Sequence, residues 1–175
     1  MPGALIVRVR LPPSLERLRR RCVADAMLGV PGHVTLLYPF KVPEELSSAD
    51  RRRIAAIAVA EPAFAFRLER RASWPDTVYV ALEPEAPFLR LHRRLAAAFP
   101  EYPVYGGAIG ELVPHVTVAE GACLDDPTVI GAAAWSELPS ACVASAIELI
   151  AEGENGRWQT ARRFKLGDGP AMLGP

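Results

Sequence analysis

Residues 31–40 read PGHVTLLYPF, and residues 113–119, VPHVTVA, repeat the centre of this pattern. Each copy is a short apolar, β-branched run of the kind that favours a β-strand. In a strand, residues i and i+2 project from the same face. Each histidine should therefore share a face with the threonine of its own copy, while the intervening valine packs on the opposite face. The two pairs are His33 with Thr35, and His115 with Thr117.

Two half-buried strands can carry matching polar residues without a shared role, and for one copy alone that structural interpretation is the better one. The repetition of the pair favours a common site. A histidine titrates near neutrality, so one imidazole can take a proton while a second, protonated one gives a proton away. Threonine hydroxyls can donate hydrogen bonds to non-bridging phosphate oxygens. We therefore identify four candidate catalytic residues for in-line attack on a phosphodiester: His33, Thr35, His115 and Thr117.

The two motifs, whose histidines are 115 − 33 = 82 residues apart, resemble those of the two-histidine (2H) phosphoesterase superfamily. This group includes the proteins called 2′-5′ RNA ligase and RNA 2′,3′-cyclic phosphodiesterase. The resemblance also covers the proline-rich approach over residues 100–114 and a closing segment over 158–167. It implies an α+β fold with two pseudo-symmetric lobes of mainly antiparallel sheet and outer helices. Each lobe would contribute one His-x-Thr strand to a central cleft.

The same resemblance implies a metal-independent phosphodiesterase that hydrolyses 2′,3′-cyclic phosphate or 2′-5′ phosphodiester bonds of nucleotides or RNA ends. It leaves 2′-5′ RNA ligase activity open. It assigns acid–base roles to the two histidines and phosphate-clamping roles to the two threonines. It also favours His115 as the group that activates water and His33 as the group that protonates the leaving oxygen, an assignment that the sequence itself does not settle.

One departure from the family pattern follows the second motif. Ligase-named members often carry an arginine there, whereas this chain has Ala119 and Glu120, and a carboxylate near the cleft would repel phosphates. Two other classes stay open: a non-catalytic nucleotide or RNA-end binder that keeps the clamp, and a metal-dependent hydrolase. No His-Glu-x-x-His sequence and no Cys/His cluster supports the metal-dependent class.

Composition limits the size and the partners of the protein. The chain has 175 residues, half of them hydrophobic, and 20 basic residues balance 20 acidic ones. This length is sufficient for one domain with a substantial core. Balanced charge argues against a grip on long nucleic acid through the overall field. We expect a monomer that acts on a small phosphodiester nucleotide or an RNA terminus, with no metal, no cofactor and no membrane contact.

The cysteines and the N-terminus bear on location. The three cysteines, Cys22, Cys123 and Cys142, are odd in number and widely spaced, and they form no metal-type or redox pair. Reduced thiols are therefore expected. The apolar run over residues 4–7 is interrupted by Arg8 and is neither a signal peptide nor a membrane span. The sequence thus predicts a cytoplasmic protein.

The pattern predicts strand–helix–motif strand–helix–strand, followed by a second half in a similar order. We expect one bilobal domain over residues 1–167, with halves of about 1–72 and 73–167, and a flexible tail over 168–175. Strands are predicted over 4–10, 64–70, 76–82 and at the two motifs, with a closing hairpin that pairs 142–152 with 157–166. Helices are predicted after a Ser14 cap, after Ser47-Ser48 and before Pro62, from Pro87 to Phe99, and over 128–135.

Other residues are weaker candidates. Tyr105, in the glycine-rich loop before the second motif, can stack on a base. Arg157 or Arg162, on the predicted last strand, can contact a phosphate. Tyr105 and Arg157 are the candidate substrate-binding residues. His92 is expected to be structural, and Trp74 and Trp158 to lie in the core or at its rim. The arginines of the first helix, at positions 17 and 19–21, are expected on its solvent-exposed face.

Overall fold

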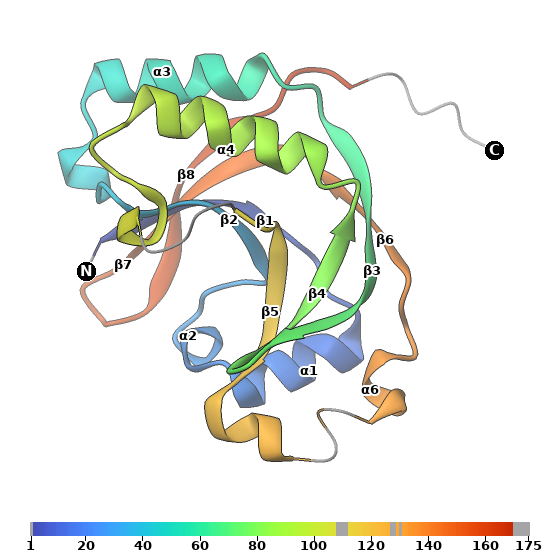
Figure 1. The fold of residues 1–175 in the computed structure, drawn as a ribbon. Coiled ribbons are helices and arrows are strands. Elements are labelled where there is room, and N and C mark those ends of the chain that lie inside the picture. Colours follow the sequence, from blue (N-terminus) through green and yellow to red (C-terminus); the bar gives the residue numbers. More distant parts are fainter. Residues whose placement is uncertain (1, 108–111, 127–128, 130, 170–175) are drawn as a thin grey trace.

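The structure, a computed structural model, describes residues 2–107, 112–126, 129 and 131–169 (Figure 1). Within these residues the strands form two antiparallel four-stranded sheets, in the orders β2-β1-β7-β8 and β5-β4-β3-β6. The predicted α+β class is confirmed. The strands are β1 (Gly3–Arg8), β2 (His33–Phe40), β3 (Phe64–Trp74), β4 (Thr77–Glu83), β5 (His115–Glu120), β6 (Ser140–Ala144), β7 (Ala146–Glu152) and β8 (Trp158–Lys165).

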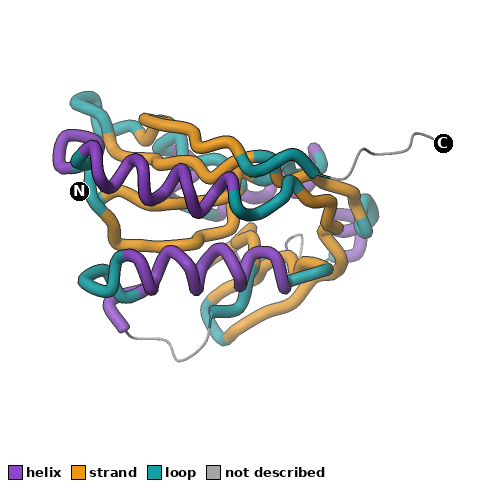
Figure 2. The backbone as a smooth tube through the Cα atoms, turned by 90° about the horizontal axis from the view of Figure 1, so that it is seen from above, coloured by secondary structure: helices purple, strands orange, loops and turns teal. Residues whose placement is uncertain are grey.

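Helices cover the outer faces of the sheets. α3 and α4 run alongside one another and pack against β8 and β2, respectively, whereas α1 packs against β5 (Figures 1 and 2). No helix of the described residues is long and apolar enough to cross a bilayer. The helices are α1 (Pro13–Cys22), α2 (Ala24–Met27), α3 (Ser48–Val59), α4 (Ala86–Ala98) and α6 (Ala132–Trp135), with 3₁₀ turns η1 (Pro43–Glu45), η2 (Val104–Gly107) and η3 (Gly121–Asp125).

The two motif strands occupy equivalent places in the two sheets. Each is an edge strand, and each pairs with the strand that precedes it in the chain. The register is also the same: His33 lies opposite Arg8 on β1, and His115 lies opposite Ala81 on β4. β2 and β5 lie side by side. The repeated pattern in the sequence is therefore matched by a repeated pattern of hydrogen bonding.

The sheets do not follow consecutive halves of the chain. The expected boundary near residue 72 falls inside β3, and β7 and β8 return to the sheet of β1 and β2. The strand predicted over 142–152 is wrong as a single element, because the chain leaves β6 at Ala144 and enters β7 of the other sheet at Ala146. Both alanines are buried, so the apolar pattern continues across the junction and does not reveal it. The predicted hairpin is confirmed as the β7–β8 pair.

Two predicted helix starts have different outcomes. Ser47 caps α3 and forms a reciprocal capping box with Asp50. The predicted Ser14 cap is wrong: α1 begins at Pro13, and the Ser14 hydroxyl donates to the Ala134 carbonyl at 3.1 Å. The Ser14 backbone N–H instead donates to the Glu137 carboxylate at 2.9 Å, which satisfies one of the unpaired donors at the helix N-terminus from a distant part of the chain.

Three further predictions concern His92, the helix over 128–135 and the C-terminal tail. His92 on α4 bonds through Nδ1 to the Leu36 carbonyl of β2 at 2.8 Å and joins helix to sheet. The helix predicted over 128–135 lies partly outside the described residues, and α6 is its described part. Most of the predicted 168–175 tail also lies outside them.

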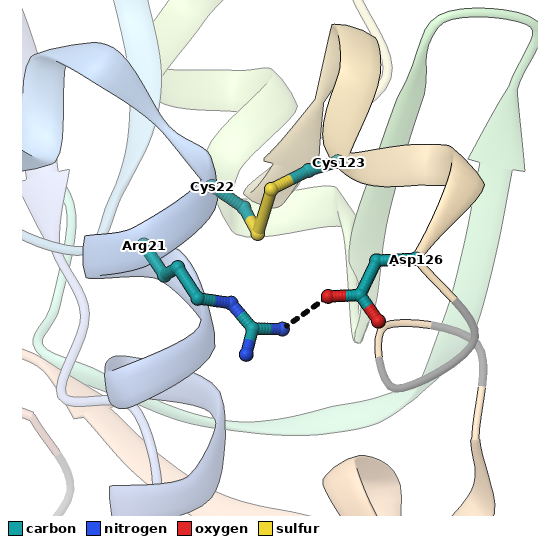
Figure 3. The surroundings of a disulfide bond; sticks show 4 residues. All are labelled: Arg21, Cys22, Cys123 and Asp126. Carbon is teal, nitrogen blue, oxygen red and sulfur yellow. Dashed lines mark hydrogen bonds and ion pairs between the residues drawn. A yellow bond between two sulfur atoms is a disulfide. The ribbon is translucent and has the colours of Figure 1, made fainter.

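A disulfide joins Cys22, at the end of α1, to Cys123 in η3, just after β5 (Figure 3). The Cα atoms are 5.6 Å apart, and Arg21 pairs with Asp126 beside the bond at 3.1 Å. The prediction of reduced thiols is therefore wrong for these two cysteines, whereas Cys142 is free. A separation of 101 residues conceals the pair in the sequence, and only the packing of α1 on β5 reveals it. The disulfide also removes the cysteine-based support for a cytoplasmic location.

We expect Cys22→Ser to lower the free energy of unfolding by about 2–4 kcal/mol, because the bond closes a loop of roughly 100 residues in the unfolded chain. Urea denaturation with and without reductant measures this difference. Cys142→Ser is the matched control and should respond to reductant as the wild type does. An unchanged wild-type midpoint on reduction would show that the bond does not stabilise the fold.

Candidate active site

The four motif side chains line one cavity of about 200 Å³ between the edge strands β2 and β5. Tyr105 lines the same cavity. Arg157 is not among the lining residues: it lies in the turn before β8, and the next residue, Trp158, lines the cavity instead. The structure thus brings together all four predicted catalytic residues and one of the two predicted substrate-binding residues.

Both imidazoles are held in the same way. Nδ1 of His33 lies 2.8 Å from the Pro31 carbonyl, and Nδ1 of His115 lies 2.7 Å from the Val113 carbonyl, in each case two residues earlier in the chain. A carbonyl can only accept a hydrogen bond, so each Nδ1 carries the hydrogen. In the neutral ring, Nε2 then keeps its lone pair and can accept a proton.

The local chain path explains the ring position on the first motif. Gly32 precedes His33, and a Cβ at this glycine would lie 2.8 Å from the Val9 carbonyl oxygen. Val9, just after β1, also donates its N–H to the Gly32 carbonyl at 2.8 Å. Glycine is therefore needed for the close approach that brings the motif onto β1.

The electrostatic surroundings of the two rings differ. Burial lowers the pKa of His33 to about 4, with further lowering from Arg19, His115 and Arg8. Burial also lowers the pKa of His115, and no nearby cation contributes there. Both imidazoles are therefore neutral at neutral pH, and the charges of Arg19 and Arg8 act on His33.

Arg8 lies directly across the β1–β2 pair from His33, so the two side chains share a sheet face. Its guanidinium donates to the buried Glu148 carboxylate at 3.0 Å and to the Thr160 hydroxyl at 2.7 Å. These two partners come from β7 and β8. They fix an arginine beside the first histidine.

Arg19 is the residue that the sequence prediction missed. It was expected on the exposed face of α1, yet it is only 2% exposed and lines the cavity. Its Nη1 donates to the Val30 carbonyl at 2.7 Å. The signal was present in the spacing, because the buried face of α1 runs through i, i+3, i+4 and i+7 and the arginine fills the i+4 place. The buried residues are Leu15, Leu18, Arg19 and Cys22.

Two carboxylates, Asp25 and Glu120, line the same cavity as Arg19. Burial raises the pKa of Glu120, the charge of Asp25 raises it further, and the charge of Arg19 opposes both. The glutamate that departs from the family pattern thus lies in the cleft, as its position after the second motif indicates. Arg19 partly offsets its negative charge.

The rest of the cavity is apolar and aromatic. A small cluster on sheet β2-β1-β7-β8, separate from the main core, forms an apolar surface. Tyr38 of this cluster meets Tyr105 edge to face, with ring centroids 6.3 Å apart. The apolar cluster consists of Ala4, Ile6, Val30 and Ile150, with Tyr38 and Trp158 packed against it.

In the part of the chain that the structure describes, no group of three or more His, Cys, Asp or Glu side chains is placed to hold a metal ion.

The family model of the 2′-5′ RNA ligase superfamily matches residues 7–156. The chain is similar to two curated proteins, each named "Putative phosphoesterase". The one from Bacillus licheniformis is 25% identical over 79% of this chain and 82% of that protein. The one from Geobacillus kaustophilus is 27% identical over 79% and 80%.

Solved structures share the fold at lower sequence identity. The TT0787 protein of Thermus thermophilus superposes with a TM-score of 0.60 at 19% identity, covering 96% of this chain and 99% of that one. LigT of E. coli, solved with 3′-AMP, gives a TM-score of 0.53 at 17% identity, covering 94% and 96%. Together with two lobes that each place a His-x-Thr strand at one cleft, these matches define a 2H phosphoesterase fold. The chain belongs to the 2′-5′ RNA ligase superfamily.

Histidine titration tests the electrostatics of the site. In an NMR titration of the free protein, we expect the His33 ring to protonate near pH 4 and the His115 ring below its ordinary 6.5. Burial causes both shifts, because it disfavours the charged imidazolium. A midpoint at or above 6.5 for either ring would contradict the buried, neutral site.

Proposed function

We propose that this protein is a metal-independent phosphodiesterase that hydrolyses 2′,3′-cyclic phosphate or 2′-5′ phosphodiester bonds of nucleotides or RNA ends. The observation that carries the proposal is the paired arrangement of two imidazoles, each with its Nδ1–H held by a carbonyl and each beside a threonine, in one cavity. The crystal structures of LigT complexed with 3′-AMP and with NADP+ support a nucleotide ligand for this chain.

In-line hydrolysis gives each imidazole one task. One Nε2 takes a proton from the attacking water as its oxygen bonds to phosphorus. The other Nε2, protonated, donates to the leaving oxygen as the opposite P–O bond breaks, so a phosphate monoester and an alcohol result. Thr35 and Thr117 donate to the non-bridging oxygens, where charge accumulates. The proton gained by one ring equals the proton lost by the other, so exchange with solvent restores the starting state.

The charges around the rings support one order of the two tasks. Burial and the charges of Arg19 and Arg8 lower the pKa of His33, whereas burial lowers the pKa of His115. We therefore propose His115 as the acid and His33 as the base. This is the reverse of the order that the family resemblance favours. A bound phosphate anion raises the pKa of both rings, since opposite charge stabilises the imidazolium, but it leaves the asymmetry in place.

Arg19 has a second role in this proposal. It is the buried cation of the cavity, and the family's frequent arginine after the second motif is Glu120 here. A guanidinium keeps its charge when it is buried, because its ordinary pKa is so high. Arg19, on α1, therefore offers a phosphodiester a positive charge inside a cavity that Asp25 and Glu120 also line.

The test is turnover of nucleoside 2′,3′-cyclic phosphates and 2′-5′ dinucleotides with chelator present. The wild type should keep its rate, while His33→Ala and His115→Ala should each lose about 10²- to 10⁴-fold in kcat. His92→Ala is the matched control, because its imidazole bonds to Leu36 and does not line the cavity. Loss of activity with chelator, or binding without turnover across the panel, would overturn the proposal.

An activated substrate extends the same experiment to the two roles. A nucleotide p-nitrophenyl diester releases an anion that needs no proton, so removal of the acid should matter little. We expect His115→Ala to regain most of the wild-type rate on this substrate and His33→Ala to stay impaired. Recovery by His33→Ala alone would reverse the assignment.

A further inference from the structure

A second compartment adjoins the cavity on the His115 side. It has a volume of about 290 Å³ and shares four residues with the first cavity, so the two meet at the second motif. Its own walls are Trp74, Thr77, Leu112 and Val113. The shared residues are Tyr105, His115, Thr117 and Glu120.

Trp74 lines this compartment and packs against two other rings. One face of its indole lies against Tyr79, with ring centroids 4.3 Å apart and planes inclined by 34°, and Tyr79 is itself buried. The His115 ring meets the indole edge to face at 4.7 Å. Trp74 nevertheless remains 38% exposed. An aromatic ring that packs against Tyr79 and His115 thus keeps part of its surface exposed in the second compartment.

The side chains that line the second compartment indicate the kind of ligand it can bind. Leu112 and Val113 add apolar surface, and Glu120 is the only charged side chain among the described lining residues. This surface suits a flat, largely uncharged ring and not a second phosphate. Base–aromatic stacking tolerates any base, because every base has a π-face.

We propose that Trp74 is the stacking platform for a second nucleoside, the leaving one, of a phosphodiester that spans both compartments. This inference rests on the proposed function, in which His115 protonates the leaving oxygen and therefore lies on the leaving side. The retained nucleoside occupies the first cavity, against Tyr38 and Trp158. A linear dinucleotide fills both compartments, whereas a nucleoside 2′,3′-cyclic phosphate fills only the first.

The substrate comparison separates these cases. Trp74→Ala should lower kcat/KM for a 2′-5′-linked diadenosine by about 5- to 150-fold, the loss expected for one stacked base. The same variant should lower kcat/KM for adenosine 2′,3′-cyclic phosphate by a clearly smaller factor, because that substrate loses only the packing of the indole against His115. Trp74→Phe should restore most of the dinucleotide rate, because a phenyl ring still offers a stacking face. Trp158→Ala is the matched control in the first compartment and should weaken both substrates together.

Equal losses on both substrates for Trp74→Ala would show that the indole acts only through His115, and no loss on either would show that it binds nothing. Either result overturns the proposed stacking role of Trp74 and leaves the proposed phosphodiesterase activity unaffected. If the wild type turns over neither substrate, the proposed function fails. Calorimetry of ligand binding then tests the stacking role of Trp74 separately. Trp74→Ala should then weaken binding of the diadenosine but not of adenosine 2′-monophosphate, and equal affinities of wild type and variant would overturn it.

Discussion

The hydrogen bond from each imidazole Nδ1 to the carbonyl two residues earlier is the interaction on which the site depends. It orients the ring, selects the tautomer and leaves the lone pair of the neutral ring on Nε2. The bond is possible because each histidine begins an edge strand, so the chain just before it is free of the sheet. Two copies of this local arrangement, on β2 and β5, face one cavity.

The two motif strands have similar backbone arrangements but different charged surroundings, so the two histidines are not equivalent. The His33 side carries Arg8 and Arg19, whereas the His115 side carries an aromatic wall with Trp74 against the ring. The disulfide joins two segments that contribute residues to the cavity. Cys22 lies three residues after Arg19, and Cys123 three residues after Glu120, so the bond ties α1 to the end of the second motif strand (Figure 3).

The sequence predicts the parts of the molecule that depend on short-range pattern. The His-x-Thr repeat places His33 and His115 on strands. The Ser47 cap depends only on Asp50, three residues later in the chain. Features set by contacts between distant segments are missed. The Cys22–Cys123 bond joins residues 101 apart, and the passage between sheets at residue 145 interrupts no apolar pattern. Arg19 lies between these cases, because its spacing marks a buried place but an arginine alone reads as a surface residue.

The proposed mechanism requires one phosphorus atom to fit between the two Nε2 atoms. A crystal structure with orthovanadate, which adopts the trigonal bipyramid of in-line attack, tests this directly. The vanadium should lie between His33 and His115, with an apical oxygen about 2.6–3.2 Å from each Nε2 and equatorial oxygens on the Thr35 and Thr117 hydroxyls. Vanadate bound to one histidine alone, or bound elsewhere with the cleft empty, would contradict the account.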